Sequence, residues 1–125
     1  MTIEHNKSLT RYNSFGFDIS AEYFTAVDSV DALDHAIRWS QARELPFLIL
    51  GGGSNIVFTR DVKGLVIHMS MRGIRTTTQH TGVHVQVAAG EIWHQLVSTT
   101  LEQGIFGLEN LALIPGCAGA APIQN

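Results

Sequence analysis

The sequence contains a single cysteine, Cys117, so no disulfide can form within the chain. This suits a reducing cytoplasm, and a small buried side chain is the simplest interpretation of Cys117. No segment has the apolar length needed to cross a membrane, and the polar residues 1–10 lack the apolar core of a signal peptide. These absences predict a cytoplasmic protein without a membrane partner.

Basic residues are also few, with 8 Lys and Arg against 11 Asp and Glu, and they form no dense run. The sequence therefore predicts no nucleic-acid partner. Metal ligands are equally sparse. His80 and His84 lie four apart in a segment expected to be extended, and His94 has no second ligand one helical turn away, so we predict no metal site. No Ser/His/Asp arrangement is recognisable.

Hydrophobic residues make up 45% of the chain, which is enough for a modest core. Residues 1–17 are predicted to form an N-terminal arm that is irregular through Ser14. Residues 18–70 are predicted to form a first small α/β subdomain, and residues 71–125 a partial second one, with a boundary near residues 70–75. The predicted fold class is therefore α+β.

The first subdomain shows a strand–helix–strand pattern. Tyr23–Val27 is short and β-prone, and Asp28 and Ser29 are good N-caps for a helix that should run to Arg43 or Glu44, before Pro46. The continuous apolar run Phe47–Leu50 predicts a strand buried on both faces. A strand, a crossover helix and a second strand predict a parallel pair with a right-handed connection.

Shorter signals follow. Ile56–Phe58 is predicted to be a short extended piece, Asp61–Gly64 a turn, and Leu65–Met69 a third strand. Residues 71–82 are polar and β-prone, and the alternating valines of residues 83–87 predict a half-buried strand.

A second helix is predicted to open after Gly90 and Glu91. Trp93, Val97 and Leu101 would form its apolar stripe, and Gly104 would follow its end as the C′ residue. Gly90 should bring the chain close to a neighbouring segment.

Two segments carry the chemistry. In Gly51-Gly52-Gly53-Ser54-Asn55, glycines can adopt positive φ and leave no Cβ in the way of a ligand, so backbone N–H groups can converge on an anion such as a pyrophosphate. In the segment from Leu111 to Asn125, small residues from Gly116 onward can let the backbone lie flat against a planar ligand, while Pro115 and Pro122 stiffen it. A tight glycine turn remains the alternative for the first segment.

Together with Tyr12-Asn13-Ser14-Phe15-Gly16 and Gly107-Leu108-Glu109-Asn110, these segments resemble the FAD-binding region of the vanillyl-alcohol-oxidase-type (PCMH-type) flavoproteins. Within that superfamily they are most similar to the family of UDP-N-acetylenolpyruvoylglucosamine reductases (UDP-N-acetylmuramate dehydrogenases). The resemblance runs from about Leu9 to Asn125 and implies a truncated PCMH-type fold of two small α/β subdomains with FAD between them.

The resemblance also implies a function. The family takes hydride from NADPH onto FAD and reduces a UDP-sugar substrate in peptidoglycan synthesis. It implies that Gly51, Gly52, Gly53, Ser54 and Asn55 hold the FAD diphosphate. It implies that the adenosine and flavin are lined by Ile114, Pro115, Gly116, Gly119, Ala121, Pro122 and Gln124.

The family's catalytic serine, arginine and glutamate match nothing up to Asn125, so we assign no catalytic residue and expect the chain to be a fragment that binds FAD weakly or not stably. Its exposed apolar loop would favour aggregation. The alternatives are a non-enzymatic nucleotide-binding remnant and a part of another FAD-linked oxidase. Residues 12–16 and 122–125 argue against the second alternative. The sequence does not predict an oligomeric state.

Overall fold

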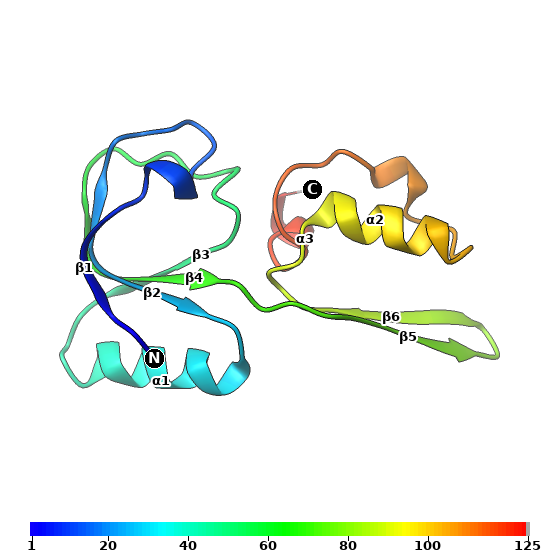
Figure 1. The fold of residues 1–125 in the computed structure, drawn as a ribbon, viewed down its shortest axis with the longest axis horizontal. Coiled ribbons are helices and arrows are strands. Elements are labelled where there is room, and N and C mark those ends of the chain that lie inside the picture. The colour runs from blue at the N-terminus through cyan, green and yellow to red at the C-terminus, as the bar shows by residue number, and fades with distance from the viewer. Residues whose placement is uncertain (125) are drawn as a thin grey trace.

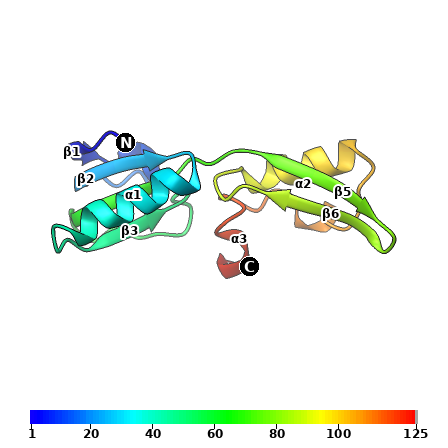
Figure 2. The same ribbon diagram turned by 90° about the horizontal axis from the view of Figure 1, so that it is seen from below.

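The computed structural model describes residues 1–124. Asn125, the last residue of the segment that resembles an FAD-binding region, lies outside the described residues. Figures 1 and 2 show two lobes, a sheet with a helix against it and a smaller unit built from a hairpin and short helices. In chain order the elements are β1 (Glu4–Ser8), the 3-10 helix η1 (Thr10–Tyr12), β2 (Ser20–Val27), α1 (Val30–Gln41), β3 (Phe47–Leu50), β4 (Val62–Met69), β5 (Ile74–Gln79), β6 (Gly82–Val87), α2 (Trp93–Glu102), the 3-10 helix η2 (Glu109–Leu111) and α3 (Ala121–Gln124).

The first sheet has the strand order β1-β2-β4-β3. Strands β2 and β3 both pair with β4 in parallel, so the predicted parallel relation is confirmed, but β4 lies between the two strands. β4 is the strand buried on both faces, since Leu65, Val66 and Ile67 are fully buried. The prediction of a doubly buried β3 was wrong, because β3 is the edge strand and its Ile49 is 44% exposed.

The N-terminal residues were wrongly predicted to be irregular. β1 pairs antiparallel with β2, from Glu4 opposite Phe24 to Ser8 opposite Ser20, and the following Leu9 is fully buried. The sequence of β1 is polar and does not alternate with apolar residues. An edge strand can lack that alternation, because main-chain pairing with its neighbour stabilises it more than side-chain burial does.

The start of β4 is a second correction. The predicted turn at Asp61–Gly64 is instead mostly strand, which begins at Val62. Gly64 has φ +82° within this strand, where a Cβ would collide with the carbonyl oxygen of Pro46. The predicted extended piece at Ile56–Phe58 belongs to no strand.

Helix α1 begins as predicted and ends earlier. The Ser29 hydroxyl accepts a hydrogen bond from the Ala32 N–H at 3.2 Å, as an N-cap does. The helix ends at Gln41 instead of Arg43 or Glu44, because the N–H of Glu44 turns back to the Gln41 carbonyl and Glu44 adopts φ +55°.

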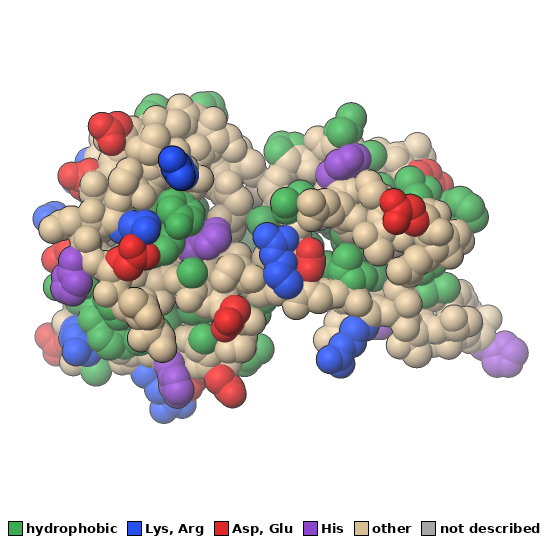
Figure 3. Space-filling view, in the orientation of Figure 1, with side chains coloured by type: hydrophobic (Ala, Val, Ile, Leu, Met, Phe, Trp, Pro, Cys, Tyr) green, Lys and Arg blue, Asp and Glu red, His purple; other side chains and the backbone are tan. Residues whose placement is uncertain are grey.

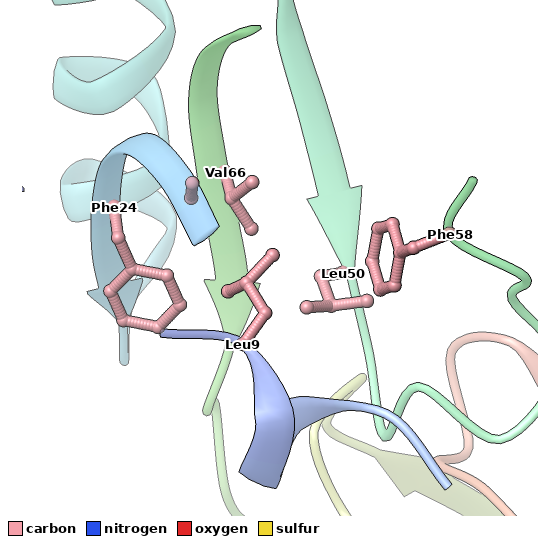
Figure 4. Packing of buried hydrophobic residues seen from close by; sticks show 6 residues of the cluster. Leu9, Phe24, Leu50, Phe58 and Val66 are labelled. Carbon is pink, nitrogen blue, oxygen red and sulfur yellow. The ribbon is translucent and has the colours of Figure 1, made fainter. Parts of the chain in front are cut away.

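Two apolar clusters cover the two faces of this sheet. On one face α1 packs against Val27, Leu65 and Ile67 through Ala36 and its apolar neighbours. The other face is covered by the 3-10 helix η1 and the loop after β3 instead of an α-helix. The buried residues of this second cluster are Leu9, Ala21, Phe24, Leu50, Phe58 and Val66, and Figure 4 shows how they pack.

The second lobe contains the antiparallel hairpin β5–β6 and helix α2. The buried residues of α2 are Leu96, Val97 and Thr100, so the predicted stripe is confirmed at Val97 and wrong at Leu101, which is 39% exposed. Gly104 follows the C-cap with φ +70°, as predicted. None of the helices within residues 1–124 combines the length and apolarity that a bilayer crossing requires.

Candidate functional site

Two adjoining hollows lie at the carboxyl ends of β3 and β4, next to α3. They have volumes of about 200 and about 300 Å³ and share four lining residues, Ile49, Gly51, Ala120 and Ile123. Small-molecule sites occupy roughly 300–1,000 Å³ and occur at the carboxyl ends of parallel strands. We call the two hollows together the groove. Figure 1 shows α3 at the side of the second lobe that faces the first lobe.

The glycine loop, residues 51–55, forms one wall of the groove. Its conformation needs glycine at Gly53, which has φ +66° and whose added Cβ would collide with the Tyr12 carbonyl oxygen. The Ser14 N–H donates to the Gly53 carbonyl at 3.0 Å. The N-terminal segment around η1 therefore supports the loop from behind, which explains why the two motifs occur together in this chain.

The main-chain N–H groups of the glycine loop have no acceptor within the described residues. Gly52, Gly53, Ser54 and Asn55 donate no main-chain hydrogen bond to any of residues 1–124. Gly53 is itself buried. Consecutive unpaired N–H groups in a turn form a concave site for an anion, and a buried N–H without a partner favours a ligand that supplies an acceptor.

The opposite wall is the ribbon, residues 114–124, which the start of α2 holds in place. The Gly116 carbonyl accepts from the Trp93 N–H at 3.0 Å, and the Ala118 N–H donates to the Glu91 carbonyl at 2.8 Å. The Gly119 N–H donates to the Ala89 carbonyl at 3.0 Å. Main-chain pairing thus fixes the ribbon, and Cys117, Gly119 and Ala120 of the ribbon line the groove.

The loop and the ribbon meet directly. A Cβ added at Gly52 would lie 3.4 Å from the Gly116 Cα, and one at Gly116 would lie 2.7 Å from the Ser54 Oγ. The Gln124 Nε2 donates to the Ser54 Oγ at 3.4 Å. Two segments more than sixty residues apart therefore form one site, in which glycine is required at Gly116 because its φ is +102°.

Gly90 approaches a neighbouring segment, as predicted, and that segment is the link between the lobes. A Cβ at Gly90 would lie 2.6 Å from the Met71 carbonyl oxygen and 2.8 Å from that of Met69. The Glu91 carboxylate also holds this link, since it accepts from the Gly73 N–H at 2.7 Å. The beginning of α2 thus connects both lobes to the ribbon.

The structure brings most of the predicted site residues to the groove. The lining includes residues 51–55, Gly119 and Gln124, and Gly116 lies directly behind the lining against Gly52. Ala121 is buried and lines neither hollow. Ile114, Pro115 and Pro122 do not line either hollow, and their role in binding remains a prediction.

Sequence reasoning missed several lining residues, namely Ile49, Leu50, Ile56, Met69, Ala89 and Ile123. Ile49 and Met69 lie at the carboxyl ends of two parallel strands, where ligands commonly bind, so the predicted strand ends were the available signal. Cys117 is buried and reduced, as predicted, and its sulfur lies at the junction of loop and ribbon.

The groove contains no charged side chain among the described residues. Lys and Arg side chains lie scattered over the face shown in Figure 3 rather than in one patch. An anionic ligand would therefore be held by main-chain N–H groups and by Ser54 and Asn55. Within residues 1–124 no group of three metal-ligating side chains occurs.

Two acidic side chains near the ribbon have structural partners. Glu109 accepts a hydrogen bond from the Gly107 N–H, which lowers the pKa of Glu109 and keeps it ionised. Glu91 is engaged with Gly73 and with Arg72, 3.4 Å away. These contacts use both carboxylates to hold the main chain.

The comparison with protein families identifies the kind of domain that contains this groove. Residues 21–125 match the model of a family described as FAD binding domain. The chain belongs to this family. The match begins at the start of β2 and includes the glycine loop, the ribbon and every strand except β1, so the FAD-binding fold expected from the sequence is confirmed as an α+β fold.

Similar proteins with a curated name support the same relationship. UDP-N-acetylenolpyruvoylglucosamine reductase from Pseudomonas fluorescens is 45% identical over 126 positions, covering 100% of this chain and 37% of that protein. The Ralstonia nicotianae reductase is 50% identical and covers 94% of this chain and 35% of that protein. The chain thus spans little more than a third of the length of these relatives.

A solved structure shows the same fold. The crystal structure of UDP-N-acetylenolpyruvylglucosamine reductase from Thermus caldophilus superposes with a TM-score of 0.69 at 27% identity, covering 97% of this chain and 41% of that one. The arrangement of this FAD-binding chain therefore matches the corresponding part of a larger reductase.

Proposed function

We propose that this chain is the FAD-binding part of a UDP-N-acetylenolpyruvoylglucosamine reductase and is inactive by itself. The similarity to reductases of that name over the whole chain supports the assignment. The observation that carries it is the meeting of the glycine loop and the ribbon around one groove. A single buried, reduced cysteine suits the cytoplasm, where we propose that the protein acts.

The groove fits the dinucleotide in shape and chemistry. An added Cβ at Gly51 would meet nothing within 4 Å, although Gly51 lines both hollows, so the space in front of it is open to a ligand. The free N–H groups of residues 52–55 suit diphosphate oxygens. The second hollow is mainly apolar, with Met69, Ala89 and Ala120 in its lining, and suits a flat ring.

The chain's own residues bind and orient the cofactor in this account. We propose that residues 51–55 hold the diphosphate, and that the ribbon, including Ile114, Pro115 and Pro122, lies along the adenosine and flavin. FAD supplies hydride transfer when bound, from NADPH to the enolpyruvyl group of the UDP-sugar, which makes UDP-N-acetylmuramate for peptidoglycan. We propose the boundary between the two subdomains at residues 70–75, where Glu91 holds Gly73.

A fluorescence titration of the purified chain with FAD tests the proposal. We expect saturable but weak binding that is lost during gel filtration. Gly51→Ala should weaken it about tenfold, because overfilling a packed contact costs about 1–3 kcal/mol. Thr78→Ala on the exposed face of β5 is the matched control and should bind like the wild type.

Each outcome has a defined meaning. A wild-type chain that shows no saturation with FAD refutes the binding function. Equal affinity of Gly51→Ala and Thr78→Ala refutes the placement of FAD in the groove. A yellow 1:1 complex that survives gel filtration contradicts the weak binding expected for this part alone.

A further inference from the structure

We propose that Trp93 and His94 are positioning residues that hold residues 111–113 by a pair of side-chain hydrogen bonds, and so place the ribbon for FAD. The inference rests on the proposed function, because it concerns the FAD-binding geometry of the ribbon. We call the two hydrogen bonds the clasp.

The clasp joins two consecutive residues at the start of α2 to the segment after η2. The Trp93 Nε1–H donates to the Leu111 carbonyl at 2.7 Å. The Leu113 N–H donates to the His94 Nδ1 at 3.2 Å. This hydrogen bond uses the imidazole tautomer whose proton is on Nε2 and whose Nδ1 is an acceptor. Trp93 thus donates and His94 accepts, and their partners Leu111 and Leu113 lie two residues apart on the same segment.

The segment that the clasp holds is strained and has little burial to fix it. Leu113 has φ +62°, a conformation that a branched side chain rarely adopts, and its side chain is 79% exposed. Such a conformation persists only where the surroundings impose it. The two hydrogen bonds are the side-chain contacts that can do so here, since Leu111 is also exposed at 42%.

Burial in the core is not the whole role of Trp93 and His94. The fully buried residues of α2 are Leu96, Val97 and Thr100, whereas Trp93 and His94 are only partly buried. Their polar ring atoms are instead both used on the same three-residue segment.

The position of the clasp links it to the groove. Three residues after Leu113 comes Gly116, whose carbonyl accepts from the Trp93 N–H at 3.0 Å and whose main chain lies against Gly52. Trp93 therefore holds the chain on both sides of Pro115, through its ring at Leu111 and through its main chain at Gly116. Loss of the ring hydrogen bond frees residues 111–113, which lead into the ribbon, and leaves the main-chain hydrogen bond to Gly116 in place.

Three variants separate the hydrogen bonds from the bulk of the side chains. Trp93→Phe keeps an aromatic ring without the N–H donor, and His94→Ala removes the acceptor. His94→Asn is the rescue variant, because its amide oxygen can replace Nδ1 as an acceptor. Gln95→Ala is the matched control, since Gln95 is exposed on the same helix turn.

Two readouts apply to each variant. Amide hydrogen exchange at Leu113 should become about tenfold faster in His94→Ala and return to within about twofold of the wild type in His94→Asn. The FAD dissociation constant should rise about threefold to tenfold in Trp93→Phe and His94→Ala, and stay unchanged in His94→Asn and Gln95→Ala.

The outcomes distinguish the clasp from the function beneath it. Unchanged Leu113 exchange in His94→Ala overturns the clasp, and faster exchange with unchanged FAD affinity overturns its role in positioning. If His94→Asn restores neither the Leu113 exchange rate nor the FAD affinity, the effect of His94→Ala comes from lost ring packing, and the inference is overturned too. If the wild-type chain does not bind FAD at all, the proposed function fails and the inference fails with it.

Discussion

Replacing Gly53 by alanine tests how the glycine loop is built. The substitution places a side chain in the left-handed region, which costs about 1–2 kcal/mol, and the new Cβ collides with the Tyr12 carbonyl oxygen. Relief of that collision moves the main chain and breaks the hydrogen bond from Ser14 to Gly53, a loss of about 1 kcal/mol. We expect the free energy of unfolding to fall by about 3 kcal/mol or more, against a total of roughly 5–15 kcal/mol for a domain.

Urea denaturation followed by circular dichroism measures this loss. With a slope near 2 kcal/mol per molar, the midpoint should shift by more than about 1 M. Gly51→Ala is the internal control, because its φ is outside the left-handed region and its Cβ would meet nothing within 4 Å, so its unfolding free energy should change by less than about 0.5 kcal/mol. Equal midpoints for the two variants would refute the reasoning about Gly53.

Two further predictions concern the first lobe. Asn13→Ala should lower the unfolding free energy by about 2 kcal/mol in the same assay, since the buried amide donates to the Leu9 carbonyl at 2.8 Å and accepts from the Phe17 N–H at 2.9 Å; an unchanged midpoint would contradict this. Burial, and secondly Arg72, lower the pKa of His68 below 6.5, so the unfolded chain takes up a proton before the folded chain does and stability falls as the pH drops below 6.5. His68→Phe should therefore lose less stability than the wild type between about pH 7.5 and about pH 5.5, and an equal loss would contradict the assignment.

Local signals in the sequence predicted the elements whose periodicity and caps are strong. Strand β2 and helix α1 with its Ser29 cap were found in this way. β1 was missed because an edge strand can be polar and depends on pairing with β2. The prediction that β3 is buried on both faces was wrong, because strand order is a long-range property. Only the structure shows that β4 lies inside the sheet and β3 at its edge.

The sequence predicted the two segments that form the groove, but not how they contact each other or which apolar residues line the space between them. Glycine-rich and small-residue segments identified the loop and the ribbon. The contact of Gly52 with Gly116, and the apolar lining from Ile49 and Met69, depend on how two distant segments pack, which no local pattern encodes. The link between Gly90 and the main chain at Met71 was expected only as an unnamed close approach.

The central claim is that the glycine loop and the ribbon bind one dinucleotide together. An NMR titration of the ¹⁵N-labelled chain with FAD measures this directly, because weak binding still moves amide signals. The account predicts that the amides of residues 51–55 and 116–124 shift along the same saturation curve, while those of the β5–β6 hairpin stay in place. Shifts confined to one of the two segments, or found mainly in the hairpin, would contradict it.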